Sequence, residues 1–273
     1  MADDDGVDVP VVYLGAEHAF RLTDLVTDTE QVTGAMPTGP WLADRNGTPL
    51  AGSLGVLVDD VIGYALIRSR SERTWSVSSE ISIDVIRPLV LATSAGPLRA
   101  ATIGVPQFDA LGGHASGIVT DPRGDTVARC TQRGRWVPFG GLPADAAPPD
   151  VDVSAATCVE DILGGTPVPV EGGAVLRLTV GPLLENPLGN MHGGISLCAS
   201  ELTATAAVTS WDAPWLTESL RVQYLRPVPA GSTIEFTATA RHVGRTRAVV
   251  DVAGTINGRL CTLGHLSGRP QPR

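Results

Sequence analysis

The chain has 273 residues, of which 43% are hydrophobic and 18% charged, as in a globular protein with a large buried core. Its net charge of -9 argues against a nucleic-acid-binding surface, which needs a basic stripe to displace phosphate counterions. All 20 basic residues are arginine, which excludes lysine Schiff-base chemistry and a Walker-type phosphate loop.

No segment has the character of a membrane span or an export signal. No apolar run approaches the roughly 20 residues that a span requires. Residues 1–10 are acidic, as in a flexible tail, and no apolar segment of signal-peptide kind follows them. The sequence therefore predicts a cytoplasmic protein with no membrane partner. The four cysteines are scattered, so neither a metal site nor a bound cofactor is expected.

The first half of the chain, residues 11–138, contains one apolar helix followed by β-type segments. The apolar stretch 53–67 predicts a helix that is buried on most sides. An alternating segment over 75–88 ends in Arg-Pro and predicts a strand. Three further strands are then expected, over 98–108, 112–121 and 125–137.

A connector rich in proline, glycine and alanine spans residues 139–156, and the second half, 157–273, repeats the same signals. An apolar helix is expected from Gly193 to about Thr209, and an alternating segment over 215–227 again ends in Arg-Pro. Three antiparallel strands should follow over 232–243, 246–256 and 259–268, with Asn257-Gly258 as a hairpin turn.

The repeated order of signals predicts an α+β fold built from two copies of one unit. Each unit is a long buried helix wrapped by a curved antiparallel sheet, which is the hotdog arrangement. Two fused copies resemble the double-hotdog proteins, whose sheets would pair edge to edge and place the two helices side by side. The alternative is an unrelated α+β protein with two meanders.

The segment from Glu185 to Gly194 ends where the second buried helix begins. The N–H groups of Gly193 and Gly194 would lie unpaired at the helix amino terminus, at the positive end of its dipole. This position favours a developing oxyanion, and two glycines let a carbonyl substrate approach the backbone closely.

Four elements follow one another at fixed spacings in this part of the chain: Asn186, His192-Gly193-Gly194, Glu201 and Thr217. Their spacing resembles that of the PaaI-like branch of the hotdog acyl-CoA thioesterases. That family has an asparagine, a His-Gly-Gly six residues later, an acid nine residues beyond the histidine, and then a serine or threonine. Glu201 departs from the aspartate that the family usually has. The resemblance implies hydrolysis of acyl-CoA to free acid and CoA by carboxylate-assisted attack of water.

Nine helical residues separate the Cα atoms of His192 and Glu201 by about 13 Å, too far for both side chains to act on one thioester. The acid must therefore come from the helix of the other half, which offers Asp59 and Asp60 in an otherwise apolar run. Laying Ala51-Gly52-Ser53 on His192-Gly193-Gly194 assigns Asp60 to the acid position. The alternative is that Asp59 faces inward.

The predicted active site joins both halves, and Asp60→Asn is expected to abolish turnover. A mirror-related second site would have Glu201 and Thr217, but Ala51 in place of the histidine, and should be degraded. The predicted catalytic residues are Asp60, Ser78, Asn186, His192, Gly193 and Gly194.

An acyl-CoA is the expected small-molecule partner, and arginines must meet its phosphates because the chain has no lysine. Arg221, Arg245 and Arg247 are the candidates. Two other functions stay open at this stage: a hotdog dehydratase or hydratase acting on enoyl thioesters, and a non-catalytic acyl-CoA sensor. Half-covered sheet edges predict a homodimer or a larger assembly.

Overall fold

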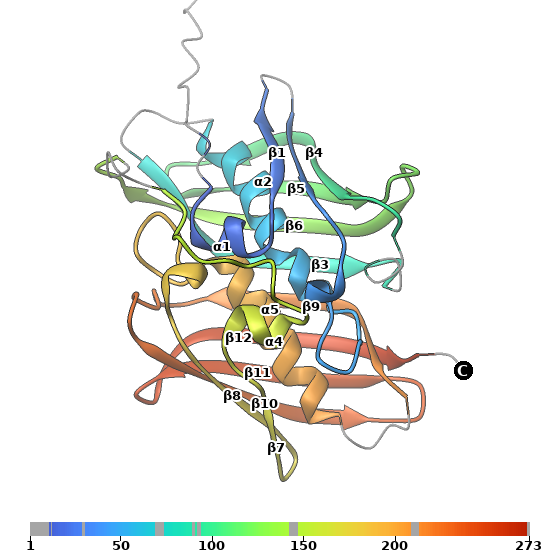
Figure 1. The fold of residues 1–273 in the computed structure, drawn as a ribbon. Coiled ribbons are helices and arrows are strands. Elements are labelled where there is room, and N and C mark those ends of the chain that lie inside the picture. The colour runs from blue at the N-terminus through green and yellow to red at the C-terminus, as the bar shows by residue number, and fades with distance from the viewer. Residues whose placement is uncertain are drawn as a thin grey trace, which may run out of the picture.

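The computed structural model describes residues 11, 13–28, 31–68, 74–88, 91, 94–141, 147–208 and 213–271. The predicted tail, 1–10, and residues 142–146 of the predicted connector lie outside them. Within the described residues, one 12-stranded antiparallel sheet curves around two helices that lie on the same side of it (Figure 1). The prediction of an α+β fold with antiparallel sheet is confirmed.

The strand order is a palindrome of the two halves of the chain. From one edge to the centre it runs through strands of the first half: β1 (Thr23–Thr27), β2 (Val32–Met36), β4 (Leu98–Phe108), β5 (Gly112–Thr120), β6 (Thr126–Pro138) and β3 (Thr74–Val85). From the centre to the other edge it runs through the second half: β9 (Trp215–Tyr224), β12 (Arg259–Pro270), β11 (Ala248–Ile256), β10 (Thr233–Val243), β8 (Gly173–Thr179) and β7 (Val168–Val170). The halves join where β3 pairs with β9, with Ile81 opposite Val222.

The two central helices are α2 (Gly55–Ile67), which continues from the 3-10 helix η2 (Ala51–Leu54), and α5 (Gly193–Ala207). Both are buried on nearly every side, as their apolar composition predicted. Their amino-terminal ends meet at Gly55 and Gly194, where the two backbones touch. A Cβ on Gly194 would overlap the amide nitrogen of Val56, so this close approach requires glycine.

Turn chemistry fixes the strand register in the second half. Asn257 and Gly258 both have positive φ, 50° and 76°, as a two-residue type I′ hairpin turn requires. They connect β11 to β12 at the predicted position. Along β11 the buried residues alternate, so one face of the strand covers α5 and the other faces outward.

Two short helices that the sequence did not reveal connect the halves. Helix α1 (Gly15–Ala19) packs on η3 (Pro182–Leu184) of the second half, and α4 (Val159–Leu163) packs on η1 (Pro40–Leu42) of the first half. Each half thus contributes a short helix that packs on the other half. No helix among the described residues has the length and apolar character needed to cross a membrane.

Candidate active site

The loop before α5 is held in shape by Asn186. Its Oδ1 accepts hydrogen bonds from the amides of Leu188, at 2.9 Å, and Asn190, at 3.2 Å. The amide of His192 then donates to the Leu184 carbonyl at 2.8 Å, which starts α5 at the next residue. Because its Oδ1 is used within the loop, Asn186 can offer a ligand only its side-chain N–H groups.

The first half contains the same loop, 142 residues earlier. Asp44 matches Asn186, since its Oδ1 also accepts from the amides two and four residues further along. The Leu50 amide donates to the Leu42 carbonyl at 3.0 Å, as His192 does in the second half. Leu50 is therefore the counterpart of His192. The alignment that placed Ala51 there is wrong by one residue.

This shift moves the acid position from Asp60 to Asp59. The Asp59 Oδ1 accepts from the Ser78 hydroxyl at 2.7 Å and from Gln132 Nε2 at 2.9 Å. Its Oδ2 accepts from the Gly194 amide at 3.2 Å, so the carboxylate lies at the amino terminus of α5. Of the two neighbouring aspartates, it is therefore Asp59, and not the predicted Asp60, that bonds the Ser78 hydroxyl.

Gln132 was not among the residues predicted from the sequence. It lies on β6, is 2% exposed, and also donates to the Ser78 hydroxyl at 2.8 Å. A polar residue at an inward-facing position of an otherwise apolar strand face was the available signal, since Ala128 and Cys130 on the same strand are buried.

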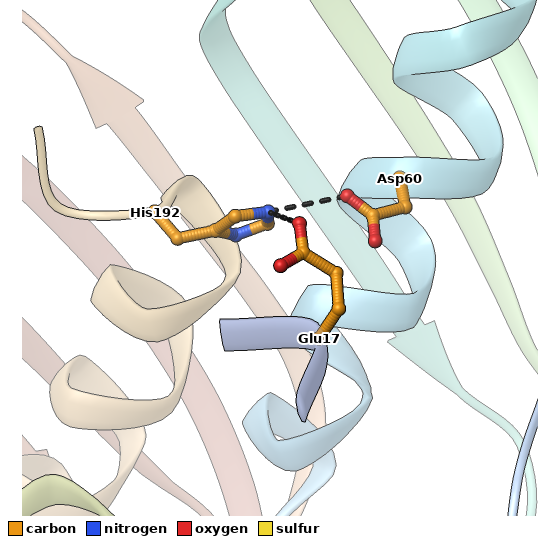
Figure 2. A group of neighbouring side chains, drawn as sticks. All are labelled: Glu17, Asp60 and His192. Atoms are coloured by element: carbon orange, nitrogen blue, oxygen red, sulfur yellow. Dashed lines mark hydrogen bonds and ion pairs between the residues drawn. The ribbon is translucent and has the colours of Figure 1, made fainter. Parts of the chain in front are cut away.

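Asp60 lies beside the Nε2 atom of the His192 ring (Figure 2). Its Oδ1 is 3.2 Å from His192 Nε2, and Glu17 Oε1 of α1 is 3.7 Å from that nitrogen. All three side chains are buried, and Asp60 Oδ2 has no hydrogen-bond partner among the described residues. Their ligand atoms lie within 4.8 Å of one another, so these three could hold a metal ion.

All three groups of this cluster have raised pKa values, the two carboxyls mainly through burial and the imidazole through neighbouring charges. Burial alone would lower the pKa of His192, but the charges of Asp59, Asp60 and Glu17 and the hydrogen bond to Asp60 raise it to about 10. Burial, and then the charge of Asp60, raises the pKa of Glu17 to about 7. Burial also raises the pKa of Asp60. A pKa of about 10 favours the imidazolium form of the His192 ring at neutral pH.

The mirror-related group around Glu201 is sealed. Glu201 accepts hydrogen bonds from the Gly52 amide and the Thr217 hydroxyl, and Trp215 Nε1 donates to that hydroxyl at 2.6 Å. Glu201 is 0% exposed and Leu50 stands where the other half has His192. This group repeats the carboxylate and hydroxyl of the first site without the imidazole and without an opening.

Because Glu201 is buried, the free energy of unfolding should depend on pH through its carboxyl group. Burial raises its pKa to about 7 from 4.5, so the folded state holds a proton that the unfolded state releases between these values. The stabilisation that protonated Glu201 gives the folded state is therefore complete below pH 4.5 and is lost as the pH rises through 7. Between about pH 5 and 8 this loss amounts to about 2 kcal/mol. Urea unfolding across that range should therefore show a shallower decline for Glu201→Gln than for the wild type, whereas parallel curves would contradict the assignment.

A cavity of about 440 Å³ opens between the two halves, within the range of small-molecule sites. Its polar end is lined by Asp59, Asp60, Ser78, Gln132, Asn186, His192 and Gly193. Its apolar side is lined by Tyr64, Ile67, Trp75, Val77 and Val137. Five of the six predicted catalytic residues, Asp60, Ser78, Asn186, His192 and Gly193, therefore line one cavity, whereas Gly194, Glu201 and Thr217 do not.

The three arginines expected to meet CoA phosphates lie elsewhere. Arg221 is on the face of β9 opposite to that of the buried Leu220 and Val222, and bonds Ser82 at 3.0 Å. Arg245 and Arg247 lie in the exposed turn between β10 and β11. None of the three lines the cavity, and the arginine that does is Arg226.

Residues 188–261 match the thioesterase superfamily, and this confirms the predicted resemblance. No curated protein matches the chain. The match begins just before His192 and includes α5 and the strands that follow it up to the start of β12.

Two solved structures have a similar fold over most of the chain. The TesB protein of Mycobacterium avium subspecies paratuberculosis is 10% identical, with a TM-score of 0.61 over 94% of this chain and 98% of that one. A putative oleoyl thioesterase from Lactobacillus plantarum is 14% identical, with a TM-score of 0.58 over 92% of this chain and 100% of that one. The Escherichia coli PaaI protein is 23% identical over 41% of this chain and 83% of its own, with a TM-score of 0.39.

Proposed function

We propose that this chain is an acyl-CoA thioesterase with a double-hotdog fold and one working site, which lies between its two halves. The observation that carries the proposal is the carboxylate of Asp59, from α2, bound at the amino terminus of α5 and facing the cavity. The superfamily match and the fold of the putative thioesterases support the reaction class.

In the proposed reaction the thioester carbonyl lies against the amino terminus of α5. The amides of Gly194, Ile195 and Ser196 have partners within the described chain, at Asp59 and His192. The Gly193 N–H is thus the group that can meet the carbonyl oxygen, with the helix dipole behind it. Close approach is possible because Gly193 has no Cβ; one would lie 2.5 Å from Asp59 Oδ2.

Asp59 takes a proton from water while the water oxygen bonds to the carbonyl carbon, and the negative charge develops on the oxygen at Gly193. When the carbonyl re-forms, the carbon–sulfur bond breaks and the proton held by Asp59 passes to the CoA thiolate. Ser78 and Gln132 orient the carboxylate through its Oδ1. Direct attack by Asp59 on the carbonyl would use the same geometry and is the alternative route.

The acyl group and the nucleotide would occupy opposite ends of the cavity. The aliphatic and aromatic side chains that line it along α2 and β3 suit an acyl chain, and Tyr64 and Trp75 stack edge to face there. Arg226 replaces Arg221, Arg245 and Arg247 as the candidate for the CoA phosphates, because it is exposed at the cavity lining.

Release of free thiol from a panel of acyl-CoAs tests the proposal. Purified protein should release CoA from at least one aliphatic or aromatic member, and Asp59→Asn should not. Binding of the acyl-CoAs with no release from any of them would instead indicate a sensor. Loss of the enoyl absorbance without thiol release would indicate a hydratase.

A further inference from the structure

Glu17 is a buried carboxyl at the cavity to which the proposed reaction assigns no step. It is 3% exposed and comes from α1, outside the repeated unit that carries the other site residues. The Leu14 amide donates to its Oε2 at 3.0 Å, which directs Oε1 toward His192 Nε2. Helix α1 is itself held against the second half, since a Cβ on Gly15 would overlap the carbonyl oxygen of Pro182.

The two nitrogens of His192 face different groups. Nε2 faces Asp60 and Glu17 (Figure 2). Nδ1 lies 3.3 Å from Asp59 Oδ2 and 3.1 Å from the Gly194 amide nitrogen. If Nδ1 carries no proton, its lone pair accepts from Gly194 and opposes the Asp59 carboxylate. If Nδ1 is protonated, it donates to Asp59, and the Gly194 amide donates to the same oxygen.

The carboxylates on the Nε2 side decide between these two states. A neutral ring would give Nε2–H to Asp60 and leave Asp59 without its imidazole donor. An imidazolium donates on both sides, and each buried negative charge next to Nε2 favours it. The titratable groups that face the ring or its carboxylates are Glu17, Asp59, Asp60, Tyr13 and Tyr224.

We propose that Glu17 and Asp60 are positioning residues that keep His192 doubly protonated and fixed, so that its Nδ1–H holds Asp59 against the start of α5. This inference rests on the proposed function for its catalytic meaning, but the state of the ring itself does not. The raised pKa of His192, about 10, agrees with the geometry.

Nitrogen-15 NMR of the histidine rings tests the inference without any assay of turnover. The chain has five histidines, so the His192 signals can be assigned by their loss in His192→Gln. In the wild type both ring nitrogens should stay protonated up to about pH 9. In Glu17→Gln the pH midpoint at which the His192 ring loses its second proton should fall by about one unit or more, because a negative charge within about 6 Å of the ring is removed.

Glu160→Gln is the matched control. Glu160 is likewise a buried glutamate on a short helix, α4, is 6% exposed, and accepts a hydrogen bond from the Arg45 amide at 3.1 Å instead of facing a histidine. It should leave the His192 midpoint unchanged. If Glu17→Gln does not fold, Asp60→Asn carries the same test, with a midpoint lowered at least as much.

An unchanged His192 midpoint in both folded variants would overturn the inference, even if the protein proves to be a thioesterase. A His192 signal that changes on addition of EDTA and returns with zinc would also overturn it, and would make the cluster a metal site. If the protein hydrolyses acyl-CoA, the alkaline limb of its kcat/KM profile should move with the NMR midpoint. Movement of the midpoint in a protein that releases no thiol would uphold the positioning network and reject the proposed function alone.

Discussion

Asp59→Asn is expected to lower kcat by about 10²–10⁴-fold while leaving the fold intact. Asparagine keeps the size of the side chain and can still accept from Ser78, but it removes the base that lies at the start of α5. Asp60→Asn should lower kcat by about tenfold or less, because Asp60 touches the far side of His192. Steady-state thiol release by the two variants measures the difference.

Asp44→Asn is the control for the Asp59→Asn and Asp60→Asn variants. It places at position 44 the residue that the second half already has at position 186. It should leave turnover within about twofold, as a change outside the cavity does. A complete loss of activity in Asp60→Asn with a mild effect of Asp59→Asn would restore the original assignment and reject the shifted alignment.

Gly194→Ala is expected to destabilise the protein by about 3 kcal/mol or more, at the upper end of what overpacking costs. The added Cβ would overlap the backbone of Gly55 and Val56, and backbone cannot move away as a side-chain tip can. The two helices would have to separate at the point where the halves meet. Urea unfolding of the purified variant gives the free energy directly.

Gly181→Ala is the matched control for this glycine. Gly181 has a φ of -98°, which alanine adopts freely, and nothing lies within 4 Å of the position that the added methyl group would occupy. Its free energy of unfolding should stay within about 0.5 kcal/mol of the wild type or rise slightly. Equal stability of Gly194→Ala and Gly181→Ala would mean that the helices are not in backbone contact.

The repeated fold could be predicted because its signals are long and periodic. The start of α5 at Gly193 and the hairpin turn at Asn257-Gly258 both lie where the sequence placed them. The halves meet at β3 and β9, the two alternating segments before the Arg-Pro pairs. Helices α1 and α4 were missed, since five residues are too few to show a helical period.

The acid position was missed by one residue, for a physical reason. The small residues Ala51-Gly52-Ser53 look like a weakened His-Gly-Gly, but the register is set upstream by the Asp44 loop. Adjacent residues on a helix point about 100° apart. The one-residue slip therefore exchanged Asp59, which faces Gly194, for Asp60, which faces Nε2 of the histidine.

Two other parts of the site lay beyond the motif. Glu17 reaches the cluster only because α1 crosses to the second half, and nothing near it in the sequence indicates that contact. Arg221 could have been excluded from the sequence alone, since alternation along β9 places it on the opposite face from Val222.

A crystal structure of the protein with a ketone analogue of acyl-CoA, in which a methylene group replaces the thioester sulfur, tests the central claim most directly. The ketone oxygen should lie about 3 Å from the Gly193 nitrogen, with the ketone carbon beside the Asp59 carboxylate and the acyl chain along α2. A ketone bound next to Glu201, or held by Asp60 with Asp59 turned away, would contradict a reaction carried out by Asp59 of one half at the helix start of the other.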